Sequence, residues 1–339
     1  MGTGRIEHQL QIEKSIKEKL RNEPDFISDY YEYLVASGAE GTTCSTYIRY
    51  VAACIHGIEK KKGKKIRNIK EITAGDVTHY MSHLRFLYTN GKVKQASHSY
   101  RATVWTALNS FFSYCVKSNL LEQNYMELIA RDSASKDDVE RIALSPEELN
   151  RVISNVQEEI REKKRKGLSS IWKQRDLCII LLFIYTGMRV TALTEIDIED
   201  VNFEEQEVTI IDKNFKTHVY PLNKEIIENL KAWLLMRKTQ VGDQEPALFI
   251  STRKKRISVQ MVRKMTDQYT EILGYDKKIT PHKFRGSYVT NIYNATKDIF
   301  FAQKCVGHSK VATTELYVKD TGEERAEGLN LMEQLISTK

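Results

Sequence analysis

The sequence contains 339 residues, 41% of them hydrophobic and 29% charged, which excludes disordered, collagen-like and disulfide-scaffold chains. Gly (16) and Pro (5) are sparse, so the composition favours a largely helical protein of about two domains. Lys and Arg exceed Asp and Glu by 7, and this positive net charge is compatible with a polyanionic partner.

Neither a membrane segment nor a cysteine metal site is indicated. The chain has no uninterrupted stretch of 18 apolar residues, and its first twenty residues lack the apolar region of a secretory signal. We therefore expect a cytoplasmic protein that does not bind a membrane. The five cysteines are odd in number and show no CxxC spacing, which argues against both a disulfide framework and a zinc site.

Apolar residues return every three or four positions through the first part of the chain, as in amphipathic helices. These stripes run from Ile48 to Ile58, from Val77 to Leu84 and from Val104 to Cys115, after an earlier helix from Pro24 to Ala36. Four such helices predict a bundle over residues 21–120. Residues 1–20 are left as an N-terminal extension, either an arm or a frayed helix.

Residues 121–144 are polar and mixed in charge, and we interpret them as a linker. A second domain is predicted over residues 145–339. It begins at Ser145-Pro146-Glu147-Glu148, which combines an N-cap, Pro at the first helical position and a capping-box Glu.

The second domain is predicted to mix helices with a small hairpin. Leu177 to Tyr185 is apolar on every side, which predicts a buried helix or strand. Two β-rich segments, Val208–Ile211 and His218–Leu222, predict a hairpin whose turn carries Lys213 and Lys216. Further helices are expected at Lys224–Arg237, Lys283–Tyr293 and Glu324–Ile336. The predicted fold class is mainly α with a small β-hairpin or sheet, a helical bundle followed by a mixed α+β domain.

Basic residues gather in four runs, which we interpret as a surface for DNA or RNA phosphates. They are Lys60–Lys70, Arg161–Lys166, Arg253–Arg256 and Lys277–Arg285. The first has seven basic residues and no acid. Any one run alone is typical of a solvated face.

Four polar segments follow one another in the second domain: TGMRVTAL, IDKNFKTHVYPL, TPHKFRGSYVT and VGHSKVATTELYV. In this order they resemble the tyrosine recombinases, the phage-integrase-like family of site-specific DNA recombinases. The resemblance implies that the helical first part is a core-binding, DNA-binding domain. It also implies an active-site set of Arg189, Lys213, His282, Arg285, His308 and Tyr317.

The resemblance implies a role for each of these side chains. Arg189 and Arg285 would clamp the scissile phosphate, because guanidiniums match the charge that grows on its oxygens. Tyr317 would attack and form a 3′-phosphotyrosine, with His282 as base. Lys213, or Lys216 on the same turn, would protonate the leaving 5′-oxygen. His308 would hydrogen-bond a phosphate oxygen, and neither metal, ATP nor another cofactor is implied.

One position departs from the family pattern. Three residues after the first arginine the family commonly has an acidic residue that braces the site, and this chain has Ala192. Glu195 or Asp197 could substitute, or the site could be organised differently.

The implied partners are double-stranded DNA at specific recombination sites and, on synapsed DNA, a homotetramer in which Glu324–Ile336 docks on a neighbour or on its own domain. Accessory DNA-bending proteins are further implied partners, and the protein would associate with the bacterial nucleoid during the reaction. Lys60–Lys70 and Arg253–Arg256 would contact the DNA backbone.

The alternatives are a non-cleaving, sequence-specific regulator on the same scaffold and an enzyme like a type IB topoisomerase. A zinc site of His282, His308 and Cys305 fails on ligand spacing.

Overall fold

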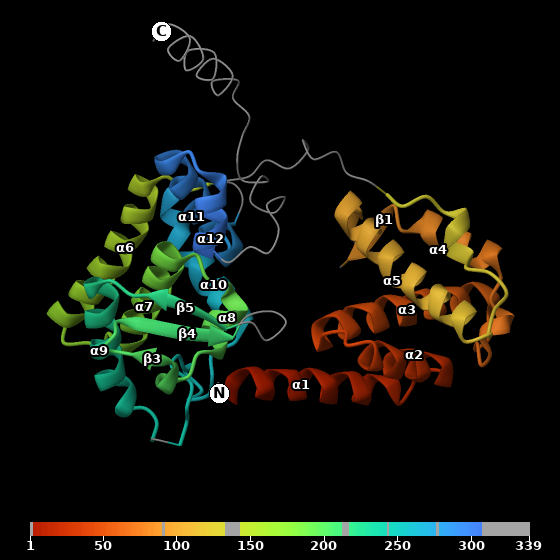
Figure 1. Cartoon of the computed structure of the whole chain (residues 1–339), viewed down its shortest axis with the longest axis horizontal. Helices are drawn as coiled ribbons and strands as arrows, with labels where there is room; N and C mark the ends of the chain where they lie inside the picture. The colour runs from red at the N-terminus through yellow and green to blue at the C-terminus, as the bar shows by residue number, and fades with distance from the viewer. Residues whose placement is uncertain are drawn as a thin grey trace, which may run out of the picture. The chain divides into compact units, whose positions relative to one another are not determined.

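The computed structural model describes residues 3–89, 92–132, 143–211, 217–242, 244–275 and 278–306. The chain divides into two compact units (Figure 1). The first unit is Ile6–Glu140, and the second combines Met1–Arg5 with Arg141–Lys339. The expected subdivision at residues 20, 120 and 144, with its assigned roles, stays a prediction.

The first unit is built mainly from helices. They are α1 (Thr3–Leu20, which begins in the second unit), α2 (Asp25–Ala36), α3 (Gly41–Lys62), α4 (Ala74–His83) and α5 (His98–Lys117), with short 3-10 helices at Ile69–Glu71 and Tyr125–Leu128. Their apolar stripes meet in one core, where the Tyr30 ring packs edge-on against Phe111 at 5.2 Å between centroids. Ile16 and Leu20 of α1 are buried in the same core.

A two-stranded hairpin interrupts the helices of this unit, and the sequence analysis did not predict it. Strand β1 (Phe86–Thr89) pairs antiparallel with β2 (Lys92–Gln95), with Phe86 opposite Gln95. Each strand is only four residues long, too short for an alternating pattern to stand out beside the helical periodicity of its neighbours.

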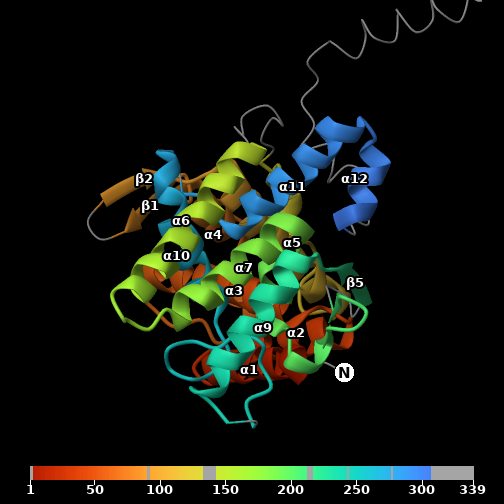
Figure 2. The ribbon, with the colours of Figure 1, turned by 90° about the vertical axis from the view of Figure 1, so that its left-hand side faces the viewer.

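The second unit begins at the predicted cap. Helix α6 (Pro146–Arg165) starts with a capping box in which the Ser145 hydroxyl accepts from the amide of Glu148 at 3.2 Å. The apolar run predicted to be buried forms helix α7 (Ile171–Thr186), which packs against α6, α9 (Lys224–Lys238) and α11 (Pro281–Thr296) (Figure 2). A helix surrounded by other helices needs no polar face, and this explains why α7 is apolar all round.

The predicted hairpin is part of a three-stranded antiparallel sheet. Its order is β3 (Val201–Asn202), β4 (Glu207–Ile211) and β5 (Thr217–Pro221), with Val208 opposite Tyr220. Helix α8 (Val190–Glu195) precedes the sheet, and α10 (Val259–Thr270) and α12 (Ile299–Val306) complete the described helices. The helical fold with small antiparallel sheets confirms the predicted fold class.

Two expected features lie outside the described residues: the turn with Lys213 and Lys216, and the helix Glu324–Ile336. Among the described helices, none combines the length and the apolar composition needed to cross a membrane.

Candidate active site and basic surfaces

The turn after α7 sets the position of the first arginine of the predicted site. Gly187 ends the helix with φ +60°, in the left-handed region. A Cβ at this position would lie 2.8 Å from Cδ1 of Tyr288, so both the backbone conformation and the packing require glycine. The turn is held by the Thr186 hydroxyl, which accepts from the amide of Met188 at 3.3 Å. Arg189 follows as the N-cap residue of α8.

The second arginine is fixed by backbone carbonyls. Arg285, on α11, is 2% exposed. Its Nη1 donates to the Gly187 carbonyl at 2.7 Å and its Nη2 to the Val306 carbonyl, also at 2.7 Å. The guanidinium therefore joins the ends of α7 and α12, and it lies beside the turn that carries Arg189.

His282 lies one turn before Arg285 on α11, within the electrostatic reach of both arginines. Desolvation, followed by the positive charges of Arg285 and Arg189, lowers the pKa of His282 below its ordinary 6.5. The side chain nevertheless stays accessible to solvent. A neutral, accessible imidazole can accept a proton at neutral pH.

Three of the six predicted site residues thus lie near one another in the second unit: Arg189, His282 and Arg285. Lys213, His308 and Tyr317 lie outside the described residues. The sequence analysis missed the carbonyls of Gly187 and Val306, which orient Arg285. Backbone acceptors leave no trace in side-chain identity, although the Thr-Gly pair before Arg189 signals the turn.

The two acids that could replace the family's bracing residue each have a cationic partner. Asp197 is fully buried and pairs with Arg256 at 2.5 Å, and Glu195 pairs with Arg5 at 3.5 Å. Ala192 itself is 2% exposed and belongs to the apolar core. Arg256 also donates to two backbone carbonyls at 3.3 Å, so this member of the predicted DNA-contacting run holds the protein's own backbone.

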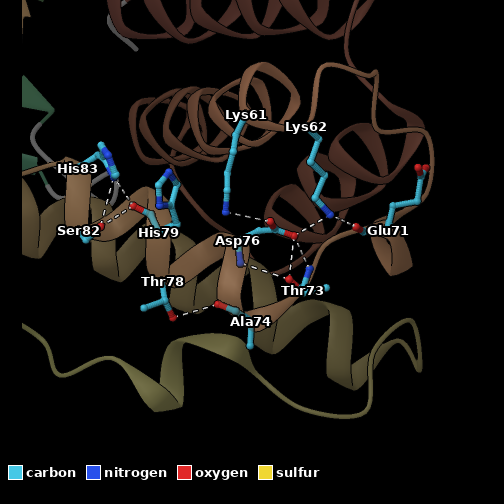
Figure 3. A network of polar contacts seen from close by, with 10 residues as sticks. All are labelled: Lys61, Lys62, Glu71, Thr73, Ala74, Asp76, Thr78, His79, Ser82 and His83. Atoms are coloured by element: carbon cyan, nitrogen blue, oxygen red, sulfur yellow. Dashed lines mark hydrogen bonds and ion pairs between the residues drawn. The ribbon is translucent and has the colours of Figure 1, made fainter.

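Acidic side chains pair with part of the Lys60–Lys70 run of the first unit (Figure 3). Lys61 and Lys62 point toward Asp76, with N–O distances of 3.5 and 2.7 Å. Outside the view, Lys65 pairs with Glu59 at 2.9 Å. Four lysines of the run have acidic partners, because Lys64 also pairs with Glu71 at 2.7 Å.

The pKa of Asp76 reflects this arrangement. Desolvation opposes ionisation, but hydrogen bonds from Lys62 and Thr73 outweigh it and lower the pKa to about 2. The carboxylate also caps α4, since it accepts from the amide of Thr73 at 3.1 Å. Lys61 and Lys62 at the end of α3 therefore connect this helix to α4 through Asp76. Lys60, Arg67 and Lys70 of the same run are exposed.

His79 and His83 lie one turn apart on α4, with ring centroids 4.1 Å apart (Figure 3). Both are exposed, and Nδ1 of His83 lies 2.8 Å from the His79 carbonyl oxygen. No cluster of three or more His, Cys, Asp or Glu side chains suited to a metal ion occurs in the part of the chain that the structure describes.

The sequence and the fold are similar to those of known proteins. The sequence profile of the phage integrase family matches residues 143–324. The chain is 28% identical over 212 residues to the tyrosine recombinase XerC of Shewanella amazonensis, which covers 62% of this chain and 67% of that protein.

Two solved structures share the fold. One is the XerH site-specific recombinase bound to palindromic difH substrate, a post-cleavage complex, with a TM-score of 0.64 and 21% identity over 88% of this chain and 82% of that chain. The other is a lambda integrase tetramer bound to a Holliday junction, with a TM-score of 0.59 and 15% identity over 87% of this chain and 77% of that chain. The profile match spans more than half of the sequence, and the chain therefore belongs to the phage integrase family of tyrosine recombinases, which are DNA strand-exchange enzymes.

Proposed function

We propose that the protein is a site-specific recombinase of the integrase or transposase type, which cleaves and rejoins DNA through a 3′-phosphotyrosine on Tyr317. The observation that carries this proposal is the clustering of Arg189, His282 and Arg285, with Arg285 locked to the backbone of the Gly187 turn. A phosphodiester is an anion that gains charge on its nonbridging oxygens as a nucleophile adds. Two permanently charged guanidiniums in a preorganised position stabilise that state.

The proposed cleavage step forms one bond for each bond that it breaks and needs no external energy source. The Tyr317 oxygen attacks the scissile phosphorus, a P–O bond to tyrosine forms, and the bond to the 5′-oxygen breaks. One phosphodiester replaces another, so the reaction needs no ATP. In rejoining, the 5′-hydroxyl of a partner strand attacks the phosphotyrosine, and tyrosine leaves as it regains a proton.

Each proton transfer has a proposed partner. His282 accepts the phenolic proton of Tyr317, since its lowered pKa keeps the imidazole neutral. Lys213, or Lys216 as the alternative, protonates the departing 5′-oxygen, which would otherwise leave as a poor alkoxide. His308 donates a hydrogen bond to a phosphate oxygen.

The two parts of the chain are proposed to divide the work. Residues 21–120 would hold the duplex and residues 145–339 would carry the chemistry, joined by a linker at 121–144. The lambda integrase relative is a tetramer on a Holliday junction, and this supports a homotetramer on synapsed sites here. We also infer action in the cytoplasm, on the nucleoid, with accessory DNA-bending proteins as further partners.

The experiment is covalent trapping. The protein and its Tyr317→Phe variant are incubated with duplexes that tile the DNA beside its own gene and carry a nick near each tested position. Cleavage next to a nick releases a short 5′-hydroxyl fragment, so religation fails and the covalent adduct accumulates. An SDS-resistant adduct with the wild type, absent with Tyr317→Phe, is the expected result.

The rival functions give different outcomes. Tight, specific binding without an adduct on any duplex would favour the non-cleaving regulator. Adducts spread without sequence preference, together with relaxation of supercoiled plasmid, would favour a topoisomerase-like enzyme.

A further inference from the structure

The β1–β2 hairpin of the first unit is a feature that the proposed chemistry does not use. In the sequence it lies between α4 and α5, and its two strands lie side by side (Figure 2). The ladder continues past β1, because the amide of Ala96 donates to the Arg85 carbonyl at 2.9 Å. Ala96 is 3% exposed and anchors the base of the hairpin.

The two faces of this ribbon differ in chemistry. Pairing of Phe86 with Gln95, and alternation along β2, put Phe86 and Val93 on one face. The opposite face receives Arg85 and Lys94. Phe86 is 52% and Val93 60% exposed, and both basic side chains are exposed as well. Each face therefore has two exposed side chains that are available to a partner.

An isolated two-stranded hairpin is only marginally stable in water, and exposed apolar side chains on it are unfavourable as well. A ribbon of this kind is stabilised when a partner covers it. The segment from Arg85 to Gln95 contains three basic residues and no acid. This contrasts with the Lys60–Lys70 run, four of whose lysines pair with three acidic neighbours. The local charge therefore favours a polyanion as the partner.

We propose that the β1–β2 hairpin is a DNA-binding ribbon that enters a groove of the duplex, in addition to any contacts that helices make. This inference rests on the proposed function for the identity of the polyanion. The major groove of B-DNA, about 12 Å wide, admits a two-stranded ribbon. Phe86 and Val93 lie against sugars and base edges, where thymine methyls offer apolar contact, and Arg85 and Lys94 contact phosphates.

The test measures DNA affinity as a function of salt in the Tyr317→Phe background, so that cleavage does not enter. The probes are the fluorescently labelled duplexes of the trapping experiment and one unrelated duplex of equal length. We expect Arg85→Glu/Lys94→Glu to weaken binding about tenfold or more. The log–log salt slope should become shallower by about 2, since each phosphate contact contributes about 0.9.

A matched control separates contact from net charge. Lys14→Glu/Lys19→Glu on α1 makes the same charge change at exposed positions of the same unit. The control should bind within about threefold of the parent. An equal loss in the two double variants would overturn the proposal, because the hairpin would then act only through overall charge.

The apolar face has its own variant. Phe86→Ser/Val93→Thr should weaken binding by about tenfold with the salt slope unchanged, since no phosphate contact is removed. Unchanged thermal melting of each variant shows that the core is intact. Parent-like affinity in both hairpin variants would overturn the proposal and would leave a protein partner as the occupant. Binding is measured without cleavage, so this test can be interpreted even if the trapping experiment yields no adduct. Conversely, an adduct would support the proposed function even if the hairpin variants bind DNA like the parent.

Discussion

Two concentrations of positive charge in this protein are built in opposite ways. Arg285 is buried, and backbone carbonyls of Gly187 and Val306 hold its guanidinium in one orientation. The lysines of the Lys60–Lys70 run are more exposed, and four of them pair with three carboxylates, those of Asp76, Glu71 and Glu59. Carbonyls orient a cation while leaving its full charge, whereas carboxylates cancel it. The difference teaches that the charge a basic side chain offers to a ligand depends on its partners in the fold. The number of basic residues in a stretch of sequence does not reveal those partners.

The largest effect of a substitution is expected at Arg285, whose guanidinium is held by backbone carbonyls. Arg285→Lys keeps the charge but loses the planar fork that reaches two carbonyls at once. Single-turnover cleavage of the trapping substrate should fall by about a hundredfold or more, roughly 3 kcal/mol of transition-state stabilisation. Duplex affinity, measured in parallel, should change little. Cleavage within threefold of the wild type would show that the fixed geometry is not needed.

The next effect is expected at the acid that balances the lysines. Asp76→Asn removes a carboxylate that accepts hydrogen bonds from Lys62 and from Thr73. The free energy of unfolding of the first unit should fall by about 2 kcal/mol, as for charged hydrogen bonds at partly buried sites. Urea denaturation followed by circular dichroism measures it, with the exposed Glu122→Gln as control.

Acid should act on the wild type as the substitution does. The folded-state pKa of Asp76 is about 2, below its ordinary 3.8, so its stabilisation is complete above the unfolded-state pKa. That contribution should be lost as the pH falls from about 4 toward 2, and the stability difference between wild type and Asp76→Asn should shrink over the same window. A constant difference down to pH 2 would contradict the ion-pair interpretation.

A smaller effect is expected at His282, which senses the arginines. Desolvation and then Arg285 and Arg189 lower its pKa. Replacement of Arg285 by Met should raise the His282 pKa toward 6.5, and NMR titration of the imidazole measures the shift without any need for activity. In the wild type, cleavage should fall as the pH drops through the lowered pKa, because the protonated ring cannot accept the phenolic proton. An unchanged His282 pKa in the Met variant would separate the histidine from the arginine site.

The smallest effect distinguishes balanced from exposed lysines directly. Lys70→Gln removes an exposed charge, and Lys62→Gln removes one that Asp76 already balances. The first should make the salt slope of DNA binding shallower by up to about 0.9, and the second should leave it unchanged. Equal slopes for the two variants would erase the distinction between the two kinds of charge.

Much of this architecture could be predicted from the sequence, because helical periodicity and capping are local signals. Ser145 and its capping box begin α6 where predicted, and the apolar run after Leu177 lies in buried α7. The β1–β2 hairpin was missed, although Asn90-Gly91 is a hairpin signal in its own right. Each strand has only four residues, so its alternating pattern is weaker than the helical periodicity on both sides.

The candidate site divides in the same way. An ordered set of residue types indicated Arg189, His282 and Arg285, since their spacing survives in sequence. The acceptors of Arg285 and the acid partners of Lys61 and Lys62 could not be predicted, because they come from residues distant in the chain or from the backbone. The partner of Arg256 is a further example, since Arg256 pairs with Asp197, which lies far from it in the sequence, while the DNA contact of Arg253–Arg256 stays a prediction.

Gly187 meets several structural requirements at one position, so substitutions there should be poorly tolerated. Any other residue there would meet the Tyr288 ring, adopt a left-handed conformation at a cost of about 1–2 kcal/mol, and displace the carbonyl that orients Arg285. The first unit, with its separate core, would be untouched. Under the proposed function, such a variant would still bind DNA through the first unit but would not cut it. A single base change would then turn the protein into a competitor of its own wild-type copies.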